Sequence, residues 1–288
     1  VSFERRSLSS ISLLSTEWLI DYSQIKPIEK IGAGAYGEVW RAKWRGIDVA
    51  VKQLPVGQSS ELGIQDFFAE AELMKKIRPH SNITQLFGVC NSPMCIITEF
   101  VVNGALYSWL RSGKLLENKV KIQIAKGTAA GMMHLHSQGI IHRDLAARNI
   151  LLDIGMNAKV SDFGMSRVSL DTQINQTTAS NVGPIRWMAP EAMAERVYNT
   201  KTDVWSFGVT LYELLTHKVP YNNLDNMQVC AQMLTAQANL LPEVEKNQDQ
   251  YPEVLVHVMR LCLNRKTDGR PTFEEIVDIF DTWETQNK

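Results

Sequence analysis

A glycine pattern near the start of the chain is the first segment whose residue types and spacing could do chemistry. Gly32, Gly34 and Gly37 form the spacing G-x-G-x-x-G, and glycines let backbone amides approach phosphate oxygens because they carry no side chain. The spacing alone is compatible with a Rossmann turn, a β-hairpin or chance. Residues 49–52, which follow it, are strand-like rather than helical, and this argues against the Rossmann turn.

Lys52 is the second candidate, because a lysine inside an apolar strand is costly unless its ammonium finds an anion. It follows the two alternating valines Val49 and Val51. Glu70 lies further along, in a stretch with helical spacing, and an ion pair between them would leave Lys52 able to hold phosphate oxygens. The alternative is a lysine at a strand edge whose ammonium reaches solvent.

The sharpest signal is the segment His-Arg-Asp-Leu-Ala-Ala-Arg-Asn at residues 142–149. Ser-Asp-Phe-Gly follows at 161–164, and Ala-Pro-Glu follows at 189–191. Taken alone, Asp144 or Asn149 is more typical of a turn or a helix cap. In this order, and together with the glycine pattern, these segments resemble those of the eukaryotic protein kinases over about residues 25–280.

The resemblance implies an enzyme that transfers the γ-phosphate of ATP to a hydroxyl group of a protein substrate. Asp144 would orient the acceptor hydroxyl or accept its proton, and Lys52, paired with Glu70, would bind the α and β phosphates. Asn149 and Asp162 would hold Mg²⁺, or alternatively Mn²⁺, because such hard cations prefer oxygen ligands. The implied catalytic set is Lys52, Glu70, Asp144, Arg148 and Asn149.

The implied nucleotide site combines the glycine pattern with the apolar positions around it. Tyr36 would lie at the tip of the glycine loop. Thr98 occupies the gatekeeper position before the connector that begins at Glu99, whose backbone is expected to meet the adenine edge. The implied ATP-binding positions are Gly32, Gly34, Tyr36, Gly37, Val39, Ala50, Lys52, Thr98, Glu99, Val101 and Leu151.

Other positions resemble structural residues of the family. Asp203 is expected to brace the catalytic loop, and it is also a candidate N-cap for a helix beginning with Val204 and Trp205. Glu191 and Arg270 are expected to form a buried ion pair. The hydrophobic spine that must stack in the active state corresponds to Met74, Leu86, His142 and Phe163.

The acceptor type is predicted from less specific features. Ala146 stands where serine/threonine kinases usually carry a lysine, and Arg148 is typical of tyrosine kinases. Pro184 would give an apolar shelf that suits a phenol ring. Residues 44–52 and 187–191 instead resemble the tyrosine-kinase-like group, most of whose members phosphorylate serine or threonine, although its protist branches combine both feature sets. A tyrosine-capable or dual-specificity kinase is predicted, with a strict serine/threonine kinase as the alternative and a pseudokinase scaffold as the less favoured one.

The segment between the Asp-Phe-Gly and Ala-Pro-Glu motifs contains no tyrosine. Activating phosphorylation there must therefore use threonine or serine, and the candidates are Thr177, Thr178 and Ser180. Arg143 is the expected anchor for that phosphate, whose charge would order the loop. The alternative is a polar loop without a regulatory phosphate.

The apolar spacing predicts the elements that position these residues. Strand-like stretches are 25–54, 83–89 and 94–102. Helical spacing is found at 64–77, 124–135 and 204–215.

Strands first and helices later predict an α+β, two-lobed protein kinase fold. The small N-terminal lobe is expected to be mainly antiparallel β-sheet plus one helix, and the larger C-terminal lobe to be mainly helical. The expected parts are a partly flexible flank at 1–24, an N-terminal lobe at 25–98, a hinge at 99–104 and a C-terminal lobe at 105–285.

Composition excludes several other classes. The 288-residue chain is 44% hydrophobic and 21% charged, with a formal charge of −1. These values argue against collagen-like, coiled-coil and disordered chains, and against a nucleic-acid partner that needs a basic surface. No apolar run is long enough to span a bilayer, so no membrane contact is predicted. The four cysteines lack CxxC and zinc spacing, which predicts reduced thiols in a cytoplasmic protein or in a cytosolic domain of a larger one.

Overall fold

The computed structural model describes residues 16–34, 37–54, 61–168 and 185–287. Its chain divides into two compact units. The first unit comprises Val1–His80 and Thr84–Val101, and the second unit comprises Ser81–Ile83 and Val102–Lys288.

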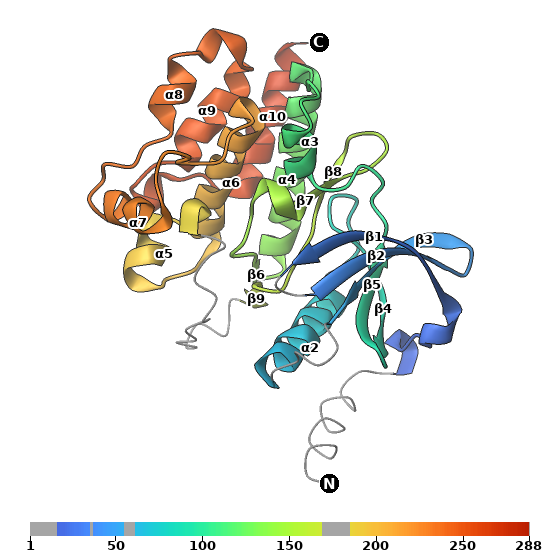
Figure 1. The fold of residues 1–288 in the computed structure, drawn as a ribbon. Coiled ribbons are helices and arrows are strands. Elements are labelled where there is room, and N and C mark those ends of the chain that lie inside the picture. Colours follow the sequence, from blue (N-terminus) through green and yellow to red (C-terminus); the bar gives the residue numbers. More distant parts are fainter. Residues whose placement is uncertain (1–15, 35–36, 55–60, 169–184, 288) are drawn as a thin grey trace. The chain divides into compact units, whose positions relative to one another are not determined.

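The first unit is built on a five-stranded antiparallel sheet with the strand order β1-β2-β3-β5-β4 (Figure 1). Most strands pair with their neighbours in sequence, as short connections favour, and β3 pairs with β5 as well as with β2. The strands are β1 (Ile25–Gly34), β2 (Gly37–Trp44), β3 (Ile47–Gln53), β4 (Leu86–Asn91) and β5 (Met94–Glu99).

The two faces of this sheet differ because side chains alternate along a strand. In β3, Val49 and Val51 are buried and join a hydrophobic core that includes Ile97 of β5. Ala50 and Lys52 therefore project from the opposite face. A register shift of one residue would exchange the two sets, so burial of the valines fixes which face carries the lysine.

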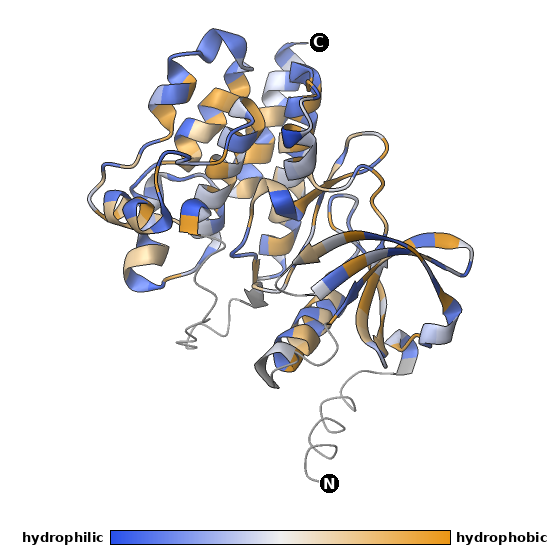
Figure 2. Cartoon of the chain, viewed as in Figure 1, coloured by the Kyte–Doolittle hydropathy of each residue, from blue (hydrophilic) through white to orange (hydrophobic). Residues whose placement is uncertain are grey.

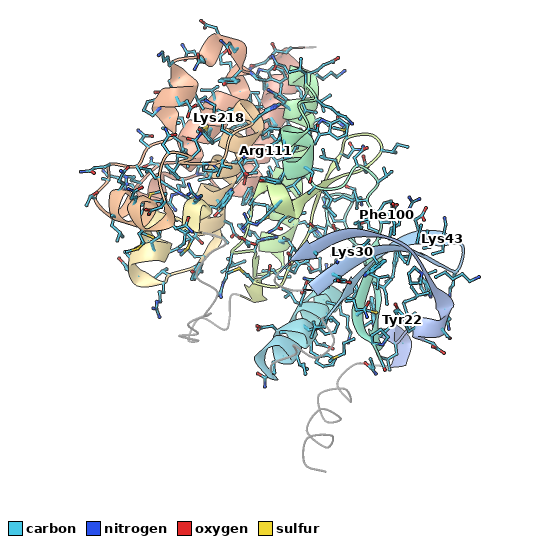
Figure 3. All side chains as sticks on the ribbon, viewed as in Figure 1. Tyr22, Lys30, Lys43, Phe100, Arg111 and Lys218 are labelled. Carbon is cyan, nitrogen blue, oxygen red and sulfur yellow. The ribbon has the colours of Figure 1, made fainter. Side chains whose placement is uncertain are left out.

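Charged side chains on β1, β2 and β3 pair across the strands. Lys30 Nζ lies 2.6 Å from Glu38 Oε1, and Lys43 Nζ lies 3.1 Å from Asp48 Oδ2; both lysines are labelled in Figure 3. Solvent screens such exposed pairs, so they contribute little to stability. The sheet is therefore held mainly by its buried apolar face.

Helix α2 (Glu61–Lys76) is the only α-helix among the described residues of the first unit. Phe67, Ala71 and Met74 are buried, and they recur at three- or four-residue intervals as a helix with one core-facing side requires. Lys75 and Lys76 lie in its last turn, where positive charge interacts favourably with the helix dipole.

The residues just before β1 extend the sheet at strand β4. Leu19 forms a parallel bridge with Val89, and the backbone N–H of Ile20 donates to Val89 O at 2.9 Å. Gly88 leaves room for this segment, because a Cβ there would lie 2.6 Å from Trp18 O and 2.7 Å from Ile20 Cδ1. The end of the predicted flank is thus part of the first unit's core.

The second unit is mainly helical, and α6 (Thr200–Thr216) is enclosed by it. Every residue from Thr202 to Leu215 is buried, so neighbours surround this helix on all sides. Figure 2 shows hydrophobic residues along α6 and α9. The other α-helices described in this unit are α3 (Leu106–Arg111), α4 (Asn118–Ser137), α5 (Pro190–Glu195), α7 (Asn226–Leu234), α8 (Leu241–Glu245), α9 (Glu253–Cys262) and α10 (Phe273–Gln286).

Two short antiparallel strand pairs fix the ends of the motif-bearing segments. β6 (Ile140–Ile141) pairs with β9 (Arg167–Val168), and β7 (Ile150–Leu152) pairs with β8 (Ala158–Val160). Residues 142–149 run from β6 to β7, whereas residues 161–166 run from β8 to β9. Both motif segments therefore start on one strand pair and end on the other.

The predicted α+β class is confirmed, with sheet plus one helix first and helices afterwards. The predicted bounds of two strands are wrong. Strand β4 begins at Leu86 rather than at Ile83, because Ile83 bridges Val160 in the second unit, and strand β5 ends at Glu99. Within the described ranges, no helix combines the length and the apolar character needed to cross a bilayer.

We expect Gly88→Ala to lower the free energy of unfolding by about 1–3 kcal/mol, because the added methyl group meets the backbone of Trp18 and the side chain of Ile20. Urea denaturation measures the loss. Gly32→Ala is the matched strand control, since the nearest atom to its added Cβ is Val39 Cβ at 3.7 Å. Equal losses in the two variants would contradict the close packing at Gly88.

Candidate active site

One face of the first unit's sheet gathers the predicted nucleotide-binding side chains. Directly opposite residues in an antiparallel pair point to the same face. Lys52 lies opposite Val39 on β2 and opposite Ile96 on β5, and Ala50 lies opposite Thr98. The sheet register therefore places the predicted phosphate-binding lysine beside the predicted adenine-binding positions, on the face away from the valine core.

Helix α2 supplies a carboxylate to the lysine on this face. Lys52 Nζ donates to both Glu70 oxygens at 2.8 Å. The side chains are 20% and 8% exposed, so the pair is largely removed from solvent. An ammonium inside an apolar strand is tolerated here because a carboxylate neutralises it. The pair has the geometry that the sequence predicts, and its role toward ATP stays a prediction.

The glycine pattern lies at the turn between β1 and β2. Gly32 is paired with Val39 and Gly34 with Gly37. Gly37 has a φ of 116°, a backbone conformation that favours glycine. Tyr36, predicted at the tip of this loop, lies outside the described residues.

The predicted connector is held to the sheet by its first residue. The backbone N–H of Gln85 donates to Glu99 Oε1 at 2.9 Å, and the backbone N–H of Glu99 donates to Gln85 O at 3.0 Å. Val101 is buried in the first unit. Leu151, the remaining predicted adenine contact, lies on β7 of the second unit opposite Lys159.

Asp144 is fixed by two side chains that follow it in the loop. Asn149 Nδ2 donates to Asp144 O at 2.7 Å and to Asp144 Oδ2 at 2.9 Å. Arg148 donates to Asp144 Oδ1. Each carboxylate oxygen therefore has one donor, and the side chain is held in a single orientation.

Burial raises the pKa of Asp144 above its ordinary value, while Arg148, His142 and Asn149 oppose that change. The negative charge of Asp162 raises it further. A raised pKa makes Asp144 a stronger base than an exposed carboxylate. Arg148 limits the rise in the pKa, because its positive charge favours the ionised carboxylate.

The two predicted ligands for a divalent cation, Asn149 and Asp162, both interact with Asp144. Because Asn149 uses its amide nitrogen on Asp144, its Oδ1 is the atom that a hard cation would take. The Asp162 carboxylate is close enough to raise the Asp144 pKa, and a cation would relieve this repulsion between like charges. No cluster of three His, Cys, Asp or Glu ligands occurs in the described ranges.

Asp203 braces the catalytic loop from helix α6. Its oxygens accept the backbone N–H of His142 at 2.8 Å and that of Arg143 at 2.9 Å. Arg143 has a φ of 68°, a strained conformation for a non-glycine residue, and the buried carboxylate holds it there. The predicted N-cap role is wrong, because α6 begins at Thr200 and is capped by Asn199.

The predicted structural residues are buried, except Glu191, whose side chain is 17% exposed. Arg270 is 1% exposed, and its guanidinium nitrogens lie 2.5 Å and 3.0 Å from the two Glu191 oxygens. The rings of His142 and Phe163 are 5.7 Å apart. Met74 and Leu86 are buried in the first unit.

The predicted regulatory residues are described only in part. Thr177, Thr178 and Ser180 lie outside the described residues. The Arg143 guanidinium carbon lies 5.0 Å from the ring centroid of Tyr198. Whether this arginine anchors a phosphate stays a prediction.

Sequence reasoning missed two residues that support this loop, Glu213 by direct contact and His136 through Asp203. His136 Nε2 lies 2.9 Å from Asp203 Oδ2, and the Glu213 carboxylate accepts the backbone N–H of Ala147. A glutamate inside the long buried stretch of α6 is an available signal, because charged residues are rarely buried without partners. His136 gives no comparable signal.

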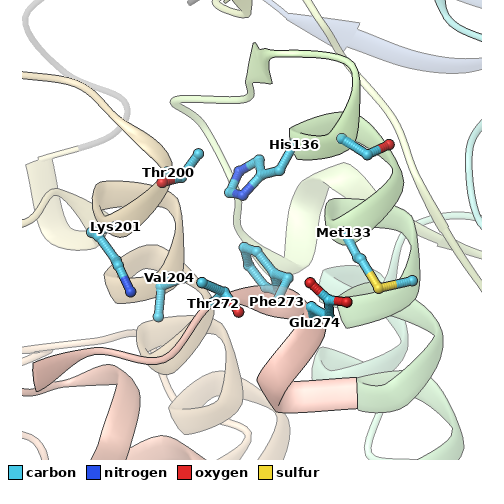
Figure 4. A pocket seen from close by; sticks show the side chains of 9 residues that line it. Met133, His136, Thr200, Lys201, Val204, Thr272, Phe273 and Glu274 are labelled. Atoms are coloured by element: carbon cyan, nitrogen blue, oxygen red, sulfur yellow. The ribbon is translucent and has the colours of Figure 1, made fainter. Parts of the chain in front are cut away.

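His136 also forms a wall of a cavity of about 180 Å³ in the second unit (Figure 4). Its ring lies above that of Phe273, with their centroids 5.1 Å apart. None of the predicted catalytic residues lines this cavity. His136 connects this cavity to the catalytic loop indirectly, through its contact with Asp203.

Comparison with known proteins agrees with this geometry. Residues 25–280 match the family described as protein tyrosine and serine/threonine kinase. The human tyrosine-protein kinase TXK is 38% identical over 276 residues, which are 93% of this chain and 50% of TXK. Tyrosine-protein kinase SRK3 of Spongilla lacustris is 37% identical over 273 residues, 93% of this chain and 78% of SRK3. A probable serine/threonine-protein kinase of Dictyostelium discoideum is 36% identical over 270 residues, 91% of this chain and 28% of that protein.

The fold and the paired charges define a phosphotransferase of the kinase class. The family match covers most of the chain, and the chain belongs to the protein tyrosine and serine/threonine kinase family. Members of this family use ATP and a divalent metal to phosphorylate proteins. The chain spans about half the length of TXK.

We expect Asp203→Asn to lower the free energy of unfolding by about 3 kcal/mol near neutral pH, because it removes a buried charge that two backbone amides require. Hydrogen bonds from His136 and His142 hold the pKa of Asp203 below its ordinary value, against the effect of burial. A lowered folded-state pKa gives stability above the unfolded value of 3.8 that is lost as the pH falls below it.

The stability gap between wild type and Asp203→Asn should therefore be constant near neutral pH and narrow below about pH 4. Urea denaturation at several pH values measures the gap. Asp249→Asn is the control, since Asp249 is exposed. A gap that stays unchanged in acid would contradict the bracing role of the ionised carboxylate.

Proposed function

We propose that this kinase domain phosphorylates tyrosine, alone or together with serine and threonine. One observation carries the proposal. Ala146 is fully buried and uncharged at the position where serine/threonine kinases usually carry lysine, and the cation that reaches Asp144 is Arg148. In the family, this Ala-x-Arg arrangement is typical of tyrosine kinases.

Two further observations support tyrosine as an acceptor. Pro184 occupies the position where serine/threonine kinases usually place a threonine. TXK and SRK3 are named tyrosine-protein kinases. A phenol is also easier to deprotonate than an alkyl alcohol, with a pKa near 10, so a carboxylate can share its proton more readily.

Asp144 is the proposed group that orients the acceptor hydroxyl and receives its proton. Its carboxylate is held between Arg148 and Asn149, which keeps the oxygens in place without solvent reorganisation. Burial increases its basicity, and Arg148 balances the charge. These residues position the proton acceptor before the substrate arrives.

ATP is the proposed phosphoryl donor. Lys52, fixed by Glu70, would neutralise charge on the α and β phosphates, and Gly32, Gly34 and Gly37 would bring backbone amides close to them. Asn149 Oδ1 and the Asp162 carboxylate are the proposed Mg²⁺ ligands. The cation supplies charge neutralisation on the phosphates when it is bound.

Regulation by phosphorylation at Thr177, Thr178 or Ser180 is part of the proposal. Arg143 would receive the phosphate, and its guanidinium already lies over the Tyr198 ring. We also propose a cytosolic location for the domain. All four cysteines are free, as thiols in a reducing compartment are.

A strict serine/threonine kinase is the second candidate. Residues 44–52 and 187–191 favour it, since they resemble the tyrosine-kinase-like group. The Dictyostelium relative is named a probable serine/threonine-protein kinase.

A peptide-library assay with ATP and Mg²⁺, followed by phospho-amino-acid analysis, decides between the two. We expect phosphotyrosine, with or without phosphoserine and phosphothreonine. Phosphoserine and phosphothreonine alone would contradict the proposed acceptor type. Asp144→Asn is the control and should lower the rate at least about a hundredfold, because general-base assistance is lost.

A further inference from the structure

The buried carboxylate of Glu213 joins two segments that are far apart in the sequence. Glu213 lies on α6 and is 3% exposed. Its Oε2 accepts the backbone N–H of Ala147 at 2.9 Å and the indole Nε1–H of Trp187 at 2.8 Å. One oxygen atom therefore holds both segments to the central helix.

The segment at Ala147 carries the side chains that fix the catalytic carboxylate. Ala147 begins a 3₁₀ turn that continues through Arg148 and Asn149. Arg148 and Asn149 both donate to Asp144. A shift of the Ala147 amide would therefore move both donors.

The segment at Trp187 lies directly before the Ala-Pro-Glu motif. Its backbone oxygen accepts a hydrogen bond from Ser206 Oγ at 2.8 Å. The Arg148 guanidinium carbon lies 4.5 Å from the centroid of its ring, a contact that stabilises a cation over an aromatic face. Arg148 is thus held between the Asp144 carboxylate and the Trp187 ring.

Glu213 responds to pH in the physiological range. Burial raises the pKa of Glu213 to about 7, against the opposing effects of Ala147 N–H, Trp187 Nε1–H, Arg148 and Arg111. Arg111, labelled in Figure 3, lies in the last turn of α3. The ionised carboxylate binds both donors more strongly than the protonated form does. A rise in pH through this range should therefore tighten the contact.

We propose that Glu213 is a positioning residue for phosphoryl transfer, which couples the Trp187 segment to Arg148 and so keeps Arg148 on Asp144. The inference rests on the proposed function, because it concerns how the same catalytic carboxylate is oriented. The indole hydrogen bond turns the ring face toward Arg148. The amide hydrogen bond fixes the turn from which Arg148 extends. Displacement of the Trp187 segment would thus reach Asp144 through Arg148, which contacts the Trp187 ring and extends from the turn that Glu213 holds.

The test compares Glu213→Gln, Trp187→Phe and the double variant. Glutamine keeps the shape and an accepting oxygen but removes the charge and its titration. Phenylalanine keeps a ring beneath Arg148 but removes the indole donor. Glu243→Gln is the matched control, because Glu243 binds Tyr212 and Lys218 instead. Thermal unfolding of each variant verifies folding.

We expect each single variant to lower kcat about tenfold and to leave the KM for ATP within about twofold. The kcat of the double variant should be no lower than that of the slower single variant, because both changes break the same contact between Trp187 and Glu213. In wild type, kcat should rise between about pH 6 and 8 as Glu213 ionises, and Glu213→Gln should lack this rise. Wild-type kcat in Glu213→Gln, or multiplicative losses in the double variant, would overturn the inference.

An inactive wild-type protein would contradict the proposed function rather than this inference. The Arg148 Nε–H resonance in NMR spectra then decides the inference without catalysis. It should shift in Glu213→Gln and in Trp187→Phe if the carboxylate holds Arg148 through the ring and the turn. An unchanged resonance in both variants would overturn the coupling.

Discussion

The segment that carries the proposed catalytic residue depends on one buried carboxylate, that of Asp203. Its two oxygens accept consecutive backbone amides at His142 and Arg143, so the chain must turn sharply around it. Arg143 adopts a left-handed conformation at this turn, which costs of the order of 1–3 kcal/mol. Charge-assisted hydrogen bonds offset that cost. The next residue is Asp144, and its direction is therefore set by a helix that does not contain it.

Each unit positions its chemistry by a different physical means. In the first unit, side chains alternate between the two faces of strand β3. Burial of Val49 and Val51 on one face therefore places Lys52 on the other face, where it contacts Glu70. The second unit uses polar groups on a buried helix, where Asp203 and Glu213 contact the loop. In a sheet, the strand register is enough to orient a side chain. An irregular loop instead needs hydrogen-bond partners for its backbone amides.

The sequence was sufficient to predict features that depend on local spacing. The pairing of Lys52 with Glu70 followed from a lysine in an apolar strand and a carboxylate on the next helix, and the structure has this contact. The cap of α6 was misplaced at Asp203, because a carboxylate before an apolar run is a typical cap. The actual cap, Asn199, belongs to a capping box with Thr202. The role of Glu213 could not be predicted from the sequence, because its partners Ala147 and Trp187 lie 66 and 26 residues away and are brought together only by the fold.

The segment that precedes β1 has a consequence for solubility. In the strand order, β4 is an edge strand. The backbone groups on the open side of an edge strand can pair with a strand of another protein molecule. Leu19 and Ile20 occupy part of this edge through their contacts with Val89. A protein shortened to start at Ile25 would leave the edge uncovered and would tend to self-associate, even though every residue of the proposed phosphotransfer site would still be present.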